Sequence, residues 1–365
     1  MGISRFQKVL LCFWLLPLGL CAQQIPEHFT RLTDSLIQAG PKTYQEINGP
    51  LRPYRRDTLL MAHFIEACHA ENYWDGLTYA YNQMGTRFRN ISAYDRSIAF
   101  HKKALEAAEK AENLEFRIFS LNMLGVVYRR REAIKTALDY NQEALELAES
   151  IEIPSIGIKR SKNVSLNSIG NIFQALEQYD RAIAHFDRSL ALERELGNKR
   201  GMAVNLQNMG ECLEAKGMLE QALYRYEKAL QYDIEIGSVS GQAICHNSIA
   251  RIYIKQGQAA EALPLLETAY GEALESKDQR IIVPVIVNRG WAEMEAGHLN
   301  RAESLLRDGL TLADSLNFLS NVAEAYGRLS TLKERQGAYR EALAFYRKGE
   351  EYHRRITNDV NIQYV

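Results

Sequence analysis

Residues for disulfide, metal and catalytic chemistry are scarce in this sequence. Only five of its 365 residues are cysteines, and the three that lie beyond residue 22 cannot all pair with one another: Cys68, Cys212 and Cys245. Each lies in an apolar helical pattern, so we expect buried free thiols and no disulfide framework. No glycine-rich phosphate loop, HExxH pair, CxxC pair or GxSxG elbow occurs at a spacing that chemistry could use. The sequence therefore predicts a protein that is not an enzyme and needs no cofactor.

One short segment holds four candidate metal ligands, His63, Glu66, Cys68 and His69. Successive residues of a helix are turned by about 100°, which places Cys68 and His69 roughly 180° and 240° around the axis from His63. Ligands that point to opposite sides cannot close around one ion, so no metal site is expected.

An excess of one charge and long apolar runs are also missing. The sequence has 44 basic and 45 acidic residues, spread evenly, which excludes the basic excess that nucleic acid or an anionic membrane surface requires. Beyond the N-terminus the longest apolar stretch, Ile281 to Val287, is broken by Pro284 and is too short to span a bilayer. We expect no nucleic-acid partner and no transmembrane segment in the mature chain.

The first 22 residues have the three parts of a secretory signal. Arg5 and Lys8 precede an apolar core from Val9 to Leu20, and Cys21-Ala22 ends the segment on a small residue. We predict cleavage after Ala22 and export to the periplasm or the cell surface. Loss of the two basic residues leaves 42 basic against 45 acidic ones, a formal charge of −3. The alternative, a lipid anchor on Cys21, is disfavoured because Leu20 stands where lipoprotein signals carry Gly, Ala or Ser.

Small residues return with a period of about 40 residues. Gly85 is followed, at spacings of 40, 45, 40, 40, 40 and 40, by Gly125, Gly170, Gly210, Ala250, Gly290 and Ser330. Antiparallel helices cross closely only where one presents little side-chain bulk to the other, so the period predicts stacked helix pairs. Turn glycines between the two helices of the late repeats support this pairing: Gly217, Gly257, Gly297 and Gly337.

These repeats resemble the tetratricopeptide repeat (TPR) family. The resemblance rests on phrases such as Asn167-Ser168-Ile169-Gly170 and Tyr226-Glu227-Lys228-Ala229-Leu230, and it covers about Leu77 to Ile356. The forty-residue period departs from the family's common repeat and is typical of a longer-helix subgroup that includes kinesin light chains and bacterial peptide-sensing regulators. The resemblance implies an all-α, right-handed solenoid of about seven helix-turn-helix repeats over residues 77–357, followed by a short tail, residues 358–365.

The segment between the signal and the repeats, residues 23–76, is expected to form a helical N-terminal cap. Helices are predicted from Pro26 to Ala39 and from Arg56 to Ala70, joined by a loop region with Gly40-Pro41 and Asn48-Gly49-Pro50. Five extra residues before Gly170 fall around residues 151–163, where Pro154 and Gly157 indicate a surface loop.

In the resembling family the first helix of each repeat lines a concave groove. The residues three and two before the small residue, and one, four and five after it, point inward. The resemblance therefore implies a peptide-binding groove of Asn82, Arg89, Asn122, Arg129, Arg130, Asn167, Asn171, Gln207, Asn208, Glu211, Asn247, Arg251 and Lys255.

An amide stands three residues before the small one in five successive repeats, and we call these residues the carboxamide ladder: Asn82, Asn122, Asn167, Gln207 and Asn247. Each amide offers a donor and an acceptor to an extended peptide backbone. The alternative is that the amides bond to a neighbouring helix and stabilise the stack.

The sequence thus favours a non-catalytic scaffold that binds a protein or an extended peptide. Binding is expected in repeats one to five, because the ladder ends at Val287 and Gly327. The second hypothesis is the extracytoplasmic sensor part of a bacterial signalling system, associated with a histidine kinase or a transcription regulator. Such a sensor would act through a separate output partner.

Overall fold

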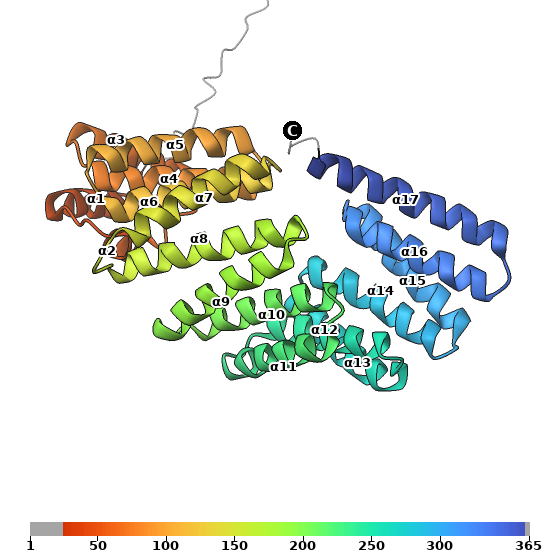
Figure 1. The fold of residues 1–365 in the computed structure, drawn as a ribbon. Coiled ribbons are helices and arrows are strands. Elements are labelled where there is room, and N and C mark those ends of the chain that lie inside the picture. The colour runs from red at the N-terminus through yellow and green to blue at the C-terminus, as the bar shows by residue number, and fades with distance from the viewer. Residues whose placement is uncertain (1–24, 362–365) are drawn as a thin grey trace, which may run out of the picture.

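The computed structural model describes residues 25–361 as seventeen α-helices (Figure 1). The predicted signal segment, residues 1–22, lies outside this described part, as do the last four residues of the predicted tail. Among residues 25–361 there is no strand, and no helix is both long and apolar enough to cross a membrane. The all-α prediction is confirmed.

Fourteen of these helices form seven consecutive pairs, one for each predicted repeat. The pairs are α4 (Trp74–Asn90) with α5 (Tyr94–Lys110), α6 (Leu114–Arg130) with α7 (Ile134–Glu149), α8 (Ile156–Ala175) with α9 (Tyr179–Glu195), α10 (Lys199–Ala215) with α11 (Leu219–Glu235), α12 (Val239–Lys255) with α13 (Ala259–Ser276), α14 (Gln279–Glu295) with α15 (Leu299–Ser315), and α16 (Leu319–Arg335) with α17 (Tyr339–Asn361). Helix α17 continues into the predicted tail as far as residue 361.

The stack of pairs curves into an open arc, with the first repeats at one end and α17 at the other (Figure 1). Each first helix contacts the first helix of the next pair, from α4 with α6 through to α14 with α16, whereas successive second helices are at most in weak contact. The first helices therefore lie on the concave side, and we call them the inner helices. The second helices are the outer helices.

Small residues sit where the two helices of a pair cross. A Cβ atom added at Gly210 on α10 would lie 2.5 Å from the ring of Tyr226 on α11, and one at Gly170 would lie 2.6 Å from the ring of Phe186. In both repeats the large residue comes sixteen positions after the glycine. The glycine thus makes room for a fully buried ring, which confirms the predicted reason for the period.

The turns within the late repeats need a left-handed residue. Gly217, Gly257, Gly297 and Gly337 have φ angles of 77°, 77°, 84° and 75°, which favour glycine. These are the predicted turn glycines, and each one ends an inner helix.

The N-terminal cap contains three helices, one more than predicted. Between α1 (Glu27–Ala39) and α3 (Thr58–Ala70), α2 (Tyr44–Leu51) occupies the segment that we expected to be a loop. Thr43 begins α2 with a capping box, in which its hydroxyl accepts from the Glu46 amide and its own amide donates to the Glu46 carboxylate. Pro50 is tolerated in the last turn. The cap buries four large apolar side chains completely: Phe29, Ile47, Leu51 and Phe64.

The predicted loop around residues 151–163 is also shorter than expected. Ser155 caps α8 by accepting from the Ile158 amide, so the helix starts at Ile156 and has 20 residues, against 17 in most inner helices. Gly157 does not break this helix. It lies in the first turn of α8, where a Cβ atom would collide with the carboxylate of Glu115.

Candidate binding groove

Two adjoining pockets lie on the inner helices near the N-terminal end of the array. The first, which we call the aromatic pocket, measures about 340 Å³ and lies between the start of α2, α6 and the first turns of α8. The second, the arginine pocket, measures about 500 Å³ and lies between the α2–α3 turn, α4 and α6. Tyr44 and Phe119 line both pockets, and their ring centroids are 4.9 Å apart. This pair of rings forms the wall that the two pockets share.

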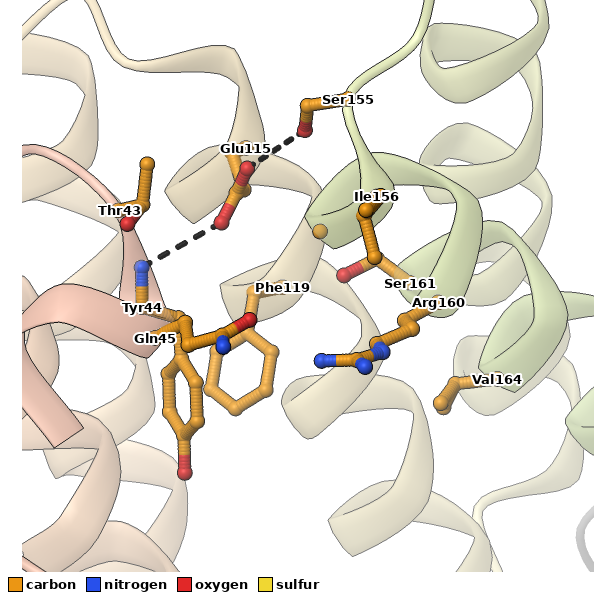
Figure 2. A pocket seen from close by; sticks show the side chains of 11 residues that line it. Thr43, Tyr44, Gln45, Glu115, Phe119, Ser155, Ile156, Arg160, Ser161 and Val164 are labelled. Carbon is orange, nitrogen blue, oxygen red and sulfur yellow. Dashed lines mark hydrogen bonds between the residues drawn. The ribbon is translucent and has the colours of Figure 1, made fainter. Parts of the chain in front are cut away.

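The aromatic pocket is mainly apolar with a few polar groups at its rim (Figure 2). Besides the two rings, Ile156 and Val164 on α8 supply apolar surface. Figure 2 shows the side chain of Arg160 directed from α8 towards Phe119. This combination suits an apolar side chain of a ligand, with a polar group close by.

Glu115 on α6 fixes the relative positions of the elements around the aromatic pocket. Its carboxylate accepts a hydrogen bond from the Tyr44 amide at 3.3 Å and one from the Ser155 hydroxyl at 2.7 Å, as Figure 2 shows. The starts of α2 and α8 are thereby tied to one side chain. The pocket is consequently preformed by contacts within the chain.

The arginine pocket has a different chemistry. Four of its ten lining residues are Arg55, Arg56, Arg87 and Arg89, and none of the ten is acidic. The other six are Tyr44, Gln83, Thr86, Asn90, Phe119 and Met123. On α4 the structure thus places the residues two before and one, four and five after Gly85 on the inner surface, including the predicted groove residue Arg89.

The carboxamide ladder lies inside the stack, whereas the sequence interpretation placed it on the open groove surface. Asn82 is fully buried between α4, α5 and α6. Its Nδ2 donates to Ser120 Oγ at 2.9 Å, and its Oδ1 lies 2.8 Å from Nδ1 of His101, which is also fully buried. Both ends of this amide are therefore used within the protein.

The later ladder residues follow the same rule. Each forms a hydrogen bond with the next inner helix, and the partner is mostly the residue five before the small residue of that next repeat. Asn122 pairs with Ser165 at 2.8 Å, Asn167 with Asn205 at 3.2 Å and Gln207 with Cys245 at 3.1 Å, while Asn247 accepts from Asn288 at 3.0 Å. These contacts match the stack-stabilising alternative, and the side chains are buried or half-buried.

The charges in the middle of the groove are paired within the chain. The buried carboxylate of Glu214 accepts from Arg251 at 2.7 and 2.6 Å and from Lys255 at 2.8 Å. Burial raises the pKa of Glu214, but the hydrogen bonds and charges of Arg251 and Lys255 outweigh this and hold the pKa below its usual range. Two predicted groove residues, Arg251 and Lys255, thus share one carboxylate of their own chain.

The remaining predicted residues of the groove differ in exposure. Glu211 is exposed and accepts from Gln174 at 2.8 Å; desolvation by the surrounding concave surface nevertheless raises its pKa. Arg130 is exposed, whereas Arg129, Asn171 and Asn208 are half-buried. Asn171 donates to the carbonyl oxygen of Asn167 at 2.8 Å.

The cysteines and the candidate metal ligands have ordinary structural surroundings. Cys68, Cys212 and Cys245 are buried free thiols, as predicted, and burial raises the pKa of the latter two to about 12. His69 lies with its Nε2 2.6 Å from the Tyr81 hydroxyl. In the part of the chain that the structure describes, no group of three or more His, Cys, Asp and Glu side chains is placed to hold an ion.

Sequence reasoning missed Tyr44, Arg55, Arg56 and Phe119 as groove residues. Tyr44 lies on α2, which was expected to be a loop, although Thr43 and Glu46 carry the capping-box signal. Phe119 lies six residues before Gly125, outside the five positions that the resemblance assigns to the groove.

Comparisons with known proteins agree with this architecture. Residues 78–150 and 162–235 match the tetratricopeptide repeat family model. Among solved structures, the chain is similar to the apo form of RapI, at 16% identity and TM-score 0.66, over 77% of this chain and 99% of that one. It is also similar to aspartyl phosphate phosphatase F from Bacillus subtilis, at 16% identity and TM-score 0.67, over 91% of this chain and 85% of that one. A third similar structure is the Rap conjugation gene regulator of the plasmid pLS20 in complex with the Phr* peptide. Its identity is 16% and its TM-score 0.63, over 91% of this chain and 95% of that one.

Comparison with curated protein sequences gave no match. At 16% identity the structural likenesses show the fold alone, which is a TPR-like solenoid.

Proposed function

We propose that this chain is a non-catalytic scaffold that binds an extended peptide or protein segment on its inner helices. The observation that carries the proposal is the pair of adjoining pockets on either side of Tyr44 and Phe119. Side chains of an extended peptide follow one another at about 3.3 Å per residue, so nearby residues of one segment can enter neighbouring pockets. The conjugation regulator with a similar fold was solved with a bound peptide, which supports this use of the fold.

The contacts to such a peptide come from surface residues of the pockets and not from the carboxamide ladder. Asn82 is fully buried and already donates and accepts inside the stack, so a ligand could reach it only by breaking buried hydrogen bonds. Recognition through the aromatic pocket leaves the stack intact. The binding region therefore centres on the cap and the first three repeats.

A scaffold role accounts for two of the carboxyl groups whose pKa is raised. Desolvation raises the pKa of Asp233, and Gln207 donates to it at 2.9 Å; desolvation likewise raises the pKa of Glu193, which accepts from Asn163. Both carboxylates lie in the crossing between an inner and an outer helix. They thus have structural partners, and catalysis is not needed to explain them.

The second candidate is a sensor that acts through a separate output partner. Three apolar side chains on one face of the last helix favour it: Tyr339, Leu343 and Tyr346 are 70%, 49% and 55% exposed. Their spacing of four and three residues places them in one stripe along α17. In either role we propose an exported protein, on the basis of the N-terminal signal segment.

The proposal is tested with a matched pair of substitutions. Val164 and Val204 both stand six residues before the small residue of their repeats, but only Val164 lines a pocket, and Val204 is 41% exposed. Peptides selected by display against the wild-type chain should bind Val164→Arg at least about tenfold more weakly, because a charged side chain fills the apolar space. They should bind Val204→Arg normally. Failure to select any peptide, or equal affinity for both variants and the wild type, would refute the proposal.

A further inference from the structure

Six arginines gather on the inner side of the cap and the first two repeats without a carboxylate partner: Arg55, Arg56, Arg87, Arg89, Arg129 and Arg130. None of the ion pairs among residues 25–361 includes any of them. Arg55 donates to Asn48 Oδ1 at 3.3 Å, and Arg89 approaches Met123 Sδ at 3.9 Å. Asp57, which directly follows Arg56, is engaged as the cap of α3, where it accepts from the amides of Leu59 and Leu60.

Three of these guanidinium groups, those of Arg89, Arg129 and Arg130, are close enough to repel one another. Burial lowers the pKa of Arg89, and the positive charges of Arg130 and Arg129 lower it further. The pKa of Arg129 is lowered by burial and then by the charge of Arg130, and its Nε is buried without a hydrogen-bond partner. Arginines remain charged at neutral pH in spite of such shifts, so the repulsion is a standing cost to the folded chain.

The excess of positive charge around these arginines is local, because the whole chain has nearly equal numbers of basic and acidic residues. Further along the groove Arg251 and Lys255 share the carboxylate of Glu214, and Arg335 pairs with Glu295 at 2.8 Å. By contrast, none of the four arginines that line the arginine pocket has an ion-pair partner among residues 25–361. A concave site lined by one sign of charge attracts ligands of the other sign.

Resting on the proposed function, we infer that the ligand is an acidic peptide segment. Its carboxylates bind in the arginine pocket while a neighbouring apolar side chain enters the aromatic pocket across the wall of Tyr44 and Phe119. Guanidinium groups bind carboxylates with paired, charge-assisted hydrogen bonds, which supplies the partners that these arginines lack.

The adjoining pockets decide between an acidic peptide and a free anion. A guanidinium cluster binds phosphate as readily as carboxylate, but inorganic phosphate has no apolar group to place in the aromatic pocket. A peptide that carries acidic and apolar side chains uses both pockets and the shared wall. A basic segment is excluded, because its charges would add to the repulsion already present.

The test compares three fluorescein-labelled peptides of about ten residues that share a central leucine and differ only in four flanking residues, which are Glu, Gln or Lys. Anisotropy is measured with the full mature chain at about 50 and about 200 mM salt. The Glu peptide should bind at least about tenfold more tightly than the Gln peptide, the Lys peptide should bind most weakly, and the preference should shrink at the higher salt concentration.

Two variants locate the preference. Arg56 and Arg87 are exposed, so the double substitution Arg56→Glu with Arg87→Glu leaves the core untouched and should abolish the preference for Glu over Gln. Arg194 is an exposed arginine on the outer helix α9, and Arg194→Glu should leave the preference unchanged.

Equal affinity of the wild type for the Glu and Gln peptides would overturn the inference and leave the proposed function to the display experiment. Equal losses in the double variant and in Arg194→Glu would also overturn it, because long-range charge would then explain the preference. Inorganic phosphate is added at matched ionic strength, and displacement of the Glu peptide as complete as by the unlabelled peptide would assign the site to a free anion. Retention of the labelled peptide supports the acidic segment.

Discussion

Replacement of Asn82 by alanine separates the two roles that a ladder residue can have. The substitution removes the acceptor of His101 Nδ1 and the donor to Ser120 Oγ, both at buried positions. A buried polar group that loses its partner costs about 1–3 kcal/mol, and the Ser120 hydroxyl can turn to another acceptor, so we expect the free energy of unfolding to fall by about 2–4 kcal/mol.

The measurement is urea unfolding followed by circular dichroism, together with amide hydrogen exchange in α4, α5 and α6, because repeat arrays can lose structure locally. Asn90→Ala is the matched control, since Asn90 lies at the exposed end of the same helix and should change stability by less than about 0.5 kcal/mol. An Asn82→Ala variant that unfolds like the wild type but no longer binds a selected peptide would refute the structural role of the ladder.

Three further predictions concern His101, two glycines and the N-terminus. Burial, with a contribution from the charge of Arg89, lowers the pKa of His101 to about 3. Below about pH 6.5 the unfolded chain therefore binds a proton on this histidine that the folded chain does not. As the pH falls, the stability of the wild type should decrease by up to about 1.4 kcal/mol per pH unit relative to His101→Gln. Parallel pH profiles of the two proteins would contradict this. Gly210→Ala should cost about 1–3 kcal/mol against the Tyr226 ring, whereas Gly327→Ala, with open space around its Cβ, should be neutral or stabilising in thermal melts. Mass spectrometry of exported protein should find Gln23 at the N-terminus, and a retained Met1 would count against the signal peptide.

The sequence was sufficient to predict the repeats because the small residues have a direct steric cause. Gly170 and Gly210 each face a ring on the paired helix, and a side chain of the paired helix approaches Gly85, Gly125 and Gly290 as closely. The buried cysteines and the turn glycines were predictable for similarly local reasons. Features that depend on a single helix pair can be predicted from the spacing of residues within that pair.

The placement of the ladder depends on the distance between successive inner helices, which no single repeat encodes. Asn82 and Arg89 are both on the groove side of α4 in helical projection, but Asn82 is fully buried and bonded to Ser120 on α6, whereas Arg89 lines the arginine pocket. A signal was available in the next repeat, where the residue five before the small one is polar or polarisable, as at Ser120 and Asn205. The arginine pocket was harder to predict, because Arg55 comes from the cap and meets Arg89 only in the folded chain.

The ladder also bears on how such a chain can change in length. Every bond joins one repeat to the next, mostly at one position, so whole units can be gained or lost without orphaning an amide. Excision of residues 207–246 would join the first part of α10 to the last part of α12 and restore one inner helix of the usual length. The contacts of Asn167 with Asn205 and of Asn247 with Asn288 would both survive this deletion. Such a deletion would keep these ladder bonds but remove Glu214, the partner of Arg251 and Lys255. Duplication and loss of forty-residue units in this register thus preserve the ladder, and the groove can lengthen or shorten in steps while the cap and its pockets stay unchanged.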